Sequence, residues 1–281
     1  MLSHAHHRTV IARLLFVLCL LGSAAGSESP SPGEASETAR GTYLARHVVR
    51  CQACHARRDW TAFSGPVAPG TEAEGGTVDL FGSTAAAPPL TPEALFDRSV
   101  EWIAAAILGR EPADAPAHRD RTASGLSELL PADARAIAVA VKGDPPAGDP
   151  RPSIAASEPW RGRPVDAGRY LVTVGRCRLC HGEDLGGGLE VEIPIGRSHP
   201  SANLTADPAG TTGRLDRDEF IAYFRSLDDP ALAAVPVPEG ELNTAMPWPW
   251  LAGLNEDDLG AIYDYLRSLP PVGTADAEPL P

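Results

Sequence analysis

Two short stretches, CQACH (51–55) and CRLCH (177–181), share the pattern Cys-x-x-Cys-His. Two thiols three positions apart lie on one helical turn, so both can bond the vinyl groups on one edge of a haem. The histidine that follows then points its imidazole at the iron. The pattern therefore predicts covalently bound haem c at both places. The residues expected to hold the two haems are Cys51, Cys54 and His55 at the first place, and Cys177, Cys180 and His181 at the second.

Zinc, disulfide bonds and a thiol redox pair are the alternatives for these clusters. A structural zinc needs four ligands, and each cluster offers three, with no fourth Cys or His at finger-like spacing. The two Cys-x-x-Cys pairs could share one zinc, but each belongs to its own complete motif. Two disulfides would leave both histidines without a role. A redox pair of the thioredoxin kind expects a βαβ setting, and the sequence does not suggest one.

The chain contains an internal duplication. GTYLARHVVRCQACH (41–55) aligns with GRYLVTVGRCRLCH (168–181), and ARAIAVAVKGDPP (134–146) aligns with LGAIYDYLRSLPP (259–271). Self-similarity at a fixed offset is the signature of repeated structural units. The two haem motifs therefore belong to two homologous units.

The duplication predicts two tandem domains, residues 36–146 and 164–273. Residues 147–163 between them are rich in Pro, Gly and Ser, which is typical of a linker. Long alternating runs of Val, Ile and Thr are missing, so the sequence does not indicate a sheet. We expect an all-α fold, in which short helices and long loops wrap around covalently attached haems.

The last helix of the second unit has the clearest signals. Asn255 can cap it, and the three acidic residues that follow suit the positive end of the helix dipole. One apolar face is spaced at i, i+3, i+4 and i+7. Its members are Leu259, Ile262, Tyr263 and Leu266. Asp216 with Glu219 predicts a capping box at the start of an earlier helix.

Residues 1–26 have the order of a secretory signal peptide. A basic lead precedes an apolar core at about 10–21, and small residues follow, so we expect cleavage near Ala25 or Gly26. The apolar core is shorter than the ~20 residues of a membrane span. The alternatives are an uncleaved anchor and lipidation at Cys19. The expected location is the periplasm.

The formal net charge is −13, which makes nucleic-acid binding a poor hypothesis, because phosphate contacts need a basic surface. The acidic surface can help the protein meet basic patches on a protein partner, or can serve solubility alone.

Both units resemble class I cytochrome c domains, the second more closely. The resemblance lies in YLVTVGRCRLCHG (170–182), SANLTADPAG (201–210) and AMPWPWLAGLNEDDLGAIYDYLRSLPP (245–271). The whole chain is similar to periplasmic dihaem cytochromes c that serve bacterial dehydrogenases. The resemblance implies that Met246 is the sixth iron ligand of the second haem, a ligation that raises the haem potential. It also implies that Trp248, Trp250 and Asn203 lie near that haem. The plainer alternative is that these residues fill the core.

The first unit has no methionine at the corresponding place. The alignment puts that place near Arg121, whose guanidinium stays protonated and cannot bind iron. His118, three positions away, is one candidate ligand; an open or water-filled position is the other. His47 lies on the helix that carries the first cluster, on the wrong side for this role, and we expect a surface histidine there.

The expected function is electron transfer between a dehydrogenase and a downstream acceptor or oxidase, with redox proteins as partners: a dehydrogenase, an oxidase or another cytochrome. Membrane association is expected only through a partner or an uncleaved signal. No catalytic constellation stands apart from the haem motifs, so we expect no enzyme activity. The alternatives use an open first haem: a peroxidase-like or thiosulfate dehydrogenase-like dihaem enzyme, or a sensor of small ligands. A degenerate, purely structural first unit is a further alternative.

Overall fold

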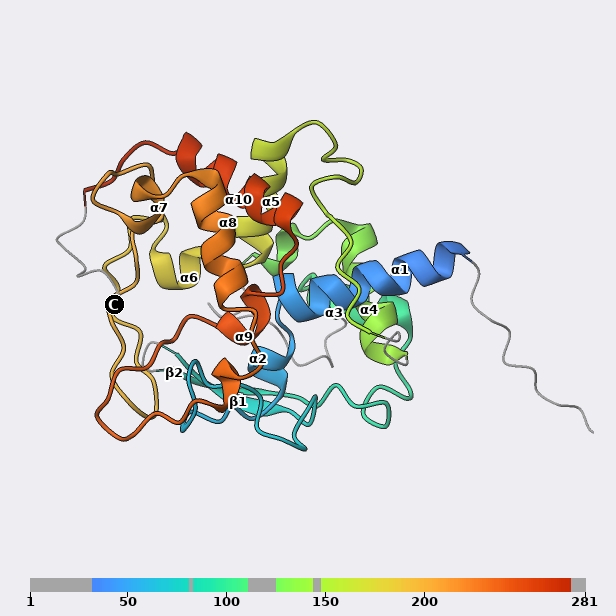
Figure 1. Ribbon diagram of the computed structural model, residues 1–281. Helices are drawn as coiled ribbons and strands as arrows, with labels where there is room; N and C mark the ends of the chain where they lie inside the picture. The colour runs from blue at the N-terminus through green and yellow to red at the C-terminus, as the bar shows by residue number, and fades with distance from the viewer. Residues whose placement is uncertain (1–31, 81–82, 111–124, 144–147, 274–281) are drawn as a thin grey trace, which may run out of the picture.

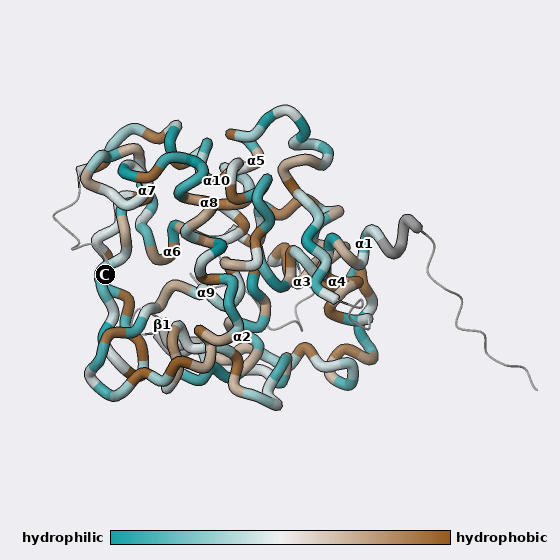
Figure 2. Tube along the Cα trace, in the orientation of Figure 1, coloured by the Kyte–Doolittle hydropathy of each residue, from teal (hydrophilic) through white to brown (hydrophobic). Residues whose placement is uncertain are grey.

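The computed structural model describes residues 32–80, 83–110, 125–143 and 148–273. Helices make up most of the regular structure (Figure 1). In chain order they are α1 (Pro32–Tyr43), the π-helix η1 (Leu44–Val48), α2 (Gln52–His55), α3 (Val100–Ile107), the 3₁₀ turn η3 (Leu126–Glu128), α4 (Pro131–Lys142), α5 (Pro164–Val174), α6 (Arg178–His181), α7 (Thr211–Arg214), α8 (Arg217–Ser226), the 3₁₀ turn η4 (Leu232–Ala234), α9 (Trp248–Leu251) and α10 (Glu256–Ser268). Hydrophilic (teal) and hydrophobic (brown) stretches follow one another along the coloured part of the chain (Figure 2).

The expected helical character is confirmed for the described residues, with one addition. Strands β1 (Gly76–Leu80) and β2 (Ser83–Ala87) pair in an antiparallel sheet. The second strand reads STAAA and carries no apolar–polar alternation, so its sequence did not indicate a strand. None of the described helices is long and apolar enough to cross a membrane, and the expected signal peptide lies outside the described residues.

Two helix pairs frame the fold: α1 packs on α4, and α5 packs on α10. Each pair meets at a glycine at the same place in its unit. A Cβ on Gly41 would overlap the carbonyl oxygen of Ala136, and a Cβ on Gly168 would overlap that of Ala261. Only glycine permits such a close approach of two helix backbones. The two units therefore use the same helix crossing.

The predicted helix signals of the second unit are confirmed. The Asn255 side chain accepts a hydrogen bond from the Asp258 N–H at 2.9 Å, and helix α10 begins at the next residue. Leu259 and Leu266 on its apolar face are buried. At α8, Asp216 and Glu219 exchange side-chain-to-backbone hydrogen bonds of 2.8 Å each, which is the predicted capping box.

The π-helix η1 explains a difference in length between the units. Ten positions separate Gly41 from Cys51, whereas nine separate Gly168 from Cys177. In η1 the N–H of Val49 bonds the carbonyl of Leu44, five residues back, at 2.7 Å. A π turn holds one residue more than an α turn. The extra residue of the first unit is absorbed there.

The core joins both units and the segment between them. One cluster of buried side chains contains Leu44 and Ile137 from the first unit and Leu171 and Leu259 from the second. Ile154, in the segment expected to be a linker, is fully buried in the same cluster. This segment is therefore packed against the rest of the protein, and the division into two tandem cytochrome c-like domains stays a prediction.

Candidate functional site

The first Cys-x-x-Cys-His cluster follows directly on η1. Cys51 precedes α2, which ends at His55. The His55 side chain is buried, and its Nδ1 lies 2.7 Å from the carbonyl oxygen of Pro88. A carbonyl oxygen can only accept, so Nδ1 carries the proton and the Nε2 lone pair can serve as a metal ligand.

The second cluster repeats this arrangement. Cys177 precedes α6, which ends at His181, and the Nδ1 of His181 donates to the carbonyl oxygen of Ala202 at 2.7 Å. Burial lowers the pKa of His181, although the hydrogen bond to Ala202 opposes this. The neutral imidazole, which is the form that binds a metal, is therefore favoured.

The four cysteines of the two clusters are free, half-buried thiols rather than disulfides. Burial raises the pKa of Cys51 to about 11, and it also raises the pKa of Cys177 and Cys180. Among the residues that the structure describes, no group of three or more His, Cys, Asp or Glu side chains is arranged to hold a metal ion.

The two clusters fit covalent haem c. Each offers two unbridged thiols on one turn and a buried imidazole whose Nδ1 lies within hydrogen-bond distance of a backbone carbonyl oxygen. In each, a backbone carbonyl fixes the orientation of the imidazole, as is usual for metal-binding histidines.

An arginine precedes each cluster, and each arginine donates a hydrogen bond to a backbone carbonyl of the other unit. The guanidinium of Arg50 donates to the carbonyl oxygen of Gly175 at 2.5 Å, and that of Arg176 donates to the carbonyl oxygen of Val49 at 2.9 Å. Gly175 precedes Arg176, and Val49 precedes Arg50, so the two contacts are reciprocal. Both arginines have left-handed backbones, with φ of 59° and 57°.

The arginine pair also lies close to the cysteines. The pKa of Arg50 is lowered to about 10, chiefly by burial and then by the charge of Arg176. Cys177, Cys180 and Cys54 act on the same guanidinium in the opposite direction. The arginines thus connect the cluster of one unit to the cluster of the other. The sequence shows an Arg-Cys dipeptide in both repeats. Only the structure shows that each of these arginines bonds the backbone of the other unit.

Met246 lies in the loop before α9, half-buried against the core. Its N–H donates to the Thr244 hydroxyl at 3.0 Å. Its carbonyl accepts a hydrogen bond from the hydroxyl of Ser64, a first-unit residue that the sequence did not single out. The role of Met246 as an iron ligand stays a prediction.

The two tryptophans expected near the second haem are buried. Trp248 packs edge-on against Tyr223 and Phe224, with ring centroids 5.6 and 5.3 Å apart. The ring of Trp250 lies 5.2 Å from the guanidinium of Arg58, which comes from the first unit. The segment after Met246 is therefore packed by both units.

Two further expectations concern a polar residue and a ligand. Asn203 is buried, and its amide donates to the Val272 carbonyl at 2.6 Å while its carbonyl accepts from Thr205. Its expected place near the second haem stays a prediction. His118 and Arg121 lie outside the described residues, so the sixth ligand of the first haem stays a prediction.

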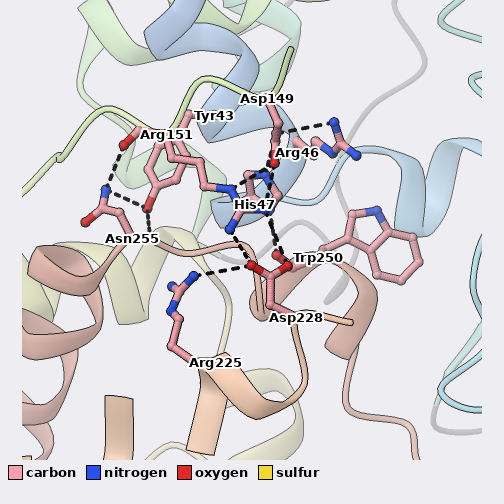
Figure 3. A network of polar contacts seen from close by, with 9 residues as sticks. All are labelled: Tyr43, Arg46, His47, Asp149, Arg151, Arg225, Asp228, Trp250 and Asn255. Atoms are coloured by element: carbon pink, nitrogen blue, oxygen red, sulfur yellow. Dashed lines mark hydrogen bonds and ion pairs between the residues drawn. The ribbon is translucent and has the colours of Figure 1, made fainter. Parts of the chain in front are cut away.

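The expectation of a surface histidine at position 47 is wrong. His47 is 2% exposed. Its Nδ1 donates to the Trp250 carbonyl at 2.7 Å, and its Nε2 lies 3.0 Å from the Asp149 carboxylate (Figure 3). Both ring nitrogens therefore lie within hydrogen-bond distance of an oxygen atom. The one-residue difference between the repeats was the available signal, because it places His47 in the π turn.

Asp149 is the centre of a charged network at this place (Figure 3). It lies 3.3 Å from Arg46 and 2.8 Å from Arg151, and Arg151 reaches Asp228 at 2.6 Å. Burial alone would raise the pKa of Asp149, but hydrogen bonds from His47 and Arg151, with the charges of His47 and Arg46, lower it. The network borders a surface cavity of about 330 Å³.

Comparison with known proteins connects the chain to cytochrome c subunits. It is 32% identical over 120 residues to the cytochrome c subunit of the quinone alcohol dehydrogenase of Gluconacetobacter polyoxogenes, which covers 41% of this chain and 24% of that protein. It is 31% identical over 119 residues to the gluconate 2-dehydrogenase cytochrome c subunit of Pantoea cypripedii, covering 41% of this chain and 25% of that protein.

A third relative is one of the subunits of the nicotinate dehydrogenase of Pseudomonas putida, 30% identical over 117 residues, which are 40% of this chain and 9% of that protein. The matches thus span a quarter or less of these relatives. No protein-family model matches the chain. Two of the three relatives are cytochrome c subunits of dehydrogenases, which supports a cytochrome c role for the matched part.

Proposed function

We propose that this protein is an exported dihaem cytochrome c that carries electrons from a dehydrogenase to a downstream acceptor or oxidase. Cys51 and Cys54 bind the first haem through thioethers, and His55 ligates its iron. The matching residues of the second unit, Cys177, Cys180 and His181, hold the second haem, with Met246 as the sixth ligand. A bound haem c supplies an iron that alternates between ferric and ferrous states.

The observation that carries this proposal is the pair of reciprocal hydrogen bonds from Arg50 to the Gly175 carbonyl and from Arg176 to the Val49 carbonyl. It keeps the two attachment clusters next to each other, with one guanidinium bonded into the backbone beside the other cluster. Two redox centres held side by side can pass an electron from one to the other without a mobile carrier. The names of the relatives support a dehydrogenase as the donor.

The sixth position of the first haem separates electron carriage from the enzyme and sensor alternatives. His118 as a ligand closes this position, whereas an open position admits peroxide or a gas. No methionine lies between the first cluster and Met246, and Met246 is assigned to the second haem. The ligand at the sixth position of the first haem is therefore another residue, such as His118, or none.

The test starts from protein matured in a host that attaches haem c. Haem is counted per chain, and the dithionite-reduced spectrum is recorded before and after addition of carbon monoxide. The same protein is then mixed with a reduced dehydrogenase, and the rate of haem reduction is followed. Two haems, fast reduction and no carbon monoxide binding support the carrier. A correctly matured chain without haem contradicts the proposal, and rapid carbon monoxide binding at the first haem favours the enzyme and sensor alternatives. His118→Ala should create that binding if His118 is the ligand.

A further inference from the structure

A turn of the first unit, residues 60–65, holds the loop that carries Met246. Within it, the hydroxyl of Ser64 donates to the carbonyl oxygen of Met246 at 2.5 Å and accepts from the N–H of Trp248 at 3.1 Å. One hydroxyl therefore bonds both residues that flank Pro247. Proline has no N–H of its own to add to this contact.

The backbone at Pro247 forms a tight turn. Its φ of −82° and ψ of 63° match an inverse γ-turn, and the Trp248 N–H also bonds the Met246 carbonyl at 2.9 Å. A three-residue turn of this kind has one hydrogen bond of its own. The Ser64 hydroxyl adds two further hydrogen bonds, one at each end of the turn.

Ser64 is itself held in place. It is fully buried, and its left-handed backbone (φ 60°) is uncommon for a residue other than glycine. Its N–H donates to the Asn243 side chain at 2.8 Å, and its carbonyl accepts from Arg58 at 2.6 Å. Strained backbone of this sort persists where the surroundings over-determine it, and it is concentrated at functional sites.

Asn243 connects the same turn to the start of the methionine loop. It is 4% exposed, and its amide donates to the carbonyls of Trp60 and Ala62 at 3.3 Å each. Its side-chain oxygen also accepts from the N–H of Thr244 at 2.8 Å. The first unit therefore contacts the loop on both sides of Met246.

We propose that Ser64 is a positioning residue for Met246, so that the first unit, which lacks a methionine of its own, fixes the axial ligand of the second haem. This rests on the proposed role of Met246 at that haem. The thioether carries no charge and is a weak ligand, so its occupancy of the iron depends on a loop that is already in place.

The experiment compares wild type with Ser64→Ala and Ser64→Gly. Both variants remove the hydroxyl, and Ser64→Gly also relieves the left-handed backbone, so a loss seen in both is not a result of strain. The readout is the weak far-red absorption band that ferric haem shows with a methionine sulfur ligand, together with carbon monoxide binding and the reduction potential of the second haem.

The expected result is a weaker far-red band and a lower potential of the second haem. Losing a buried hydrogen bond should raise the fraction of second haem open to carbon monoxide by ~10-fold. Ser157→Ala is the matched control, because the Ser157 hydroxyl bonds Ile154 and Arg40 and touches neither cluster. It should leave the band, the potential and the carbon monoxide binding unchanged.

Two outcomes overturn the inference, and they can be told apart. If wild type shows the far-red band and both Ser64 variants keep it with an unchanged potential, Ser64 has no positioning role, and the proposed ligation by Met246 stands. If wild type itself lacks the band, the proposed ligation fails, and the inference fails with it.

Discussion

The hydroxyl of Tyr43 donates a hydrogen bond of 2.8 Å to the carboxylate of Asp258, across 215 positions of sequence. Both side chains are fully buried, and burial raises the pKa of each. The same carboxylate accepts the N–H groups of Ile154 and Ala155 at 3.2 and 2.7 Å. The first unit, the segment between the units and helix α10 of the second unit thus meet at one buried carboxyl group.

Tyr43→Phe should lower the free energy of unfolding by about 1–3 kcal/mol, because it removes one donor from a buried carboxyl group. Urea denaturation measures the loss. Tyr170→Phe is the matched variant, since the Tyr170 hydroxyl bonds Asp133 of the first unit at 2.5 Å. We expect similar losses in both variants. Losses below about 0.5 kcal/mol in both, which is the range of ordinary surface substitutions, would show that these tyrosine hydrogen bonds do not stabilise the fold.

The arginine pair should show energetic coupling. Arg50→Met and Arg176→Met each leave buried carbonyl oxygens without a guanidinium donor, at a cost of about 1–3 kcal/mol per carbonyl. Each single change also relieves the repulsion between the two charges, and the double change relieves it only once. The double variant should therefore lose about 0.5–3 kcal/mol more than the sum of the single losses. Additive losses in denaturation experiments would show that the two guanidinium groups act independently.

Removing one attachment cluster at a time should separate the two haems. Cys51→Ser with Cys54→Ser should leave one haem per chain that keeps the far-red methionine band. Cys177→Ser with Cys180→Ser should leave one haem without that band, because Met246 belongs to the second unit. Haem content and the ferric spectrum measure both results. A far-red band in the second variant would contradict the assignment of Met246 to the second haem.

The stability provided by Asp149 should depend on pH. Its folded-state pKa is lowered, so its contribution is present above the unfolded carboxyl pKa, about 4, and is lost as the pH falls through the folded-state value. Asp149→Asn should therefore be less stable than wild type at pH near 6, by about 1 kcal/mol or less for a partly exposed group. This difference should shrink as the pH is lowered towards 3. A difference that stays constant with pH would assign the effect to packing.

Local signals in the sequence were enough for part of this structure. The side chains of Asn255 and Asp216 cap their helices as predicted, because a cap depends on residues within one turn. The cysteine clusters likewise form short helices whose histidines face inward. These features depend on neighbours in the sequence, and the sequence alone predicts them.

The contacts between the units could not be predicted in this way. Arg50 and Arg176 are visible in the alignment, but their partners are backbone carbonyls of the other unit, which leave no mark on residue type. His47 was misplaced because a π turn changes the face on which the following residues lie. Ser64 carried no signal in the sequence, because Met246, whose carbonyl its hydroxyl bonds, lies about 180 positions away.

The tyrosine and arginine contacts are reciprocal between the two halves of the chain. Residue i of one copy touching residue j of the other, while j touches i, is the rule of an isologous interface with two-fold symmetry. The hydrogen bonds of Tyr43 to Asp258 and of Tyr170 to Asp133 follow this two-fold pattern, and Ile154 of the intervening segment donates to the same Asp258 carboxylate. Because both halves of this arrangement belong to one chain, their sequences need not be identical. Met246 follows the second cluster, whereas no methionine lies between the first cluster and the second, a difference that two identical copies could not have.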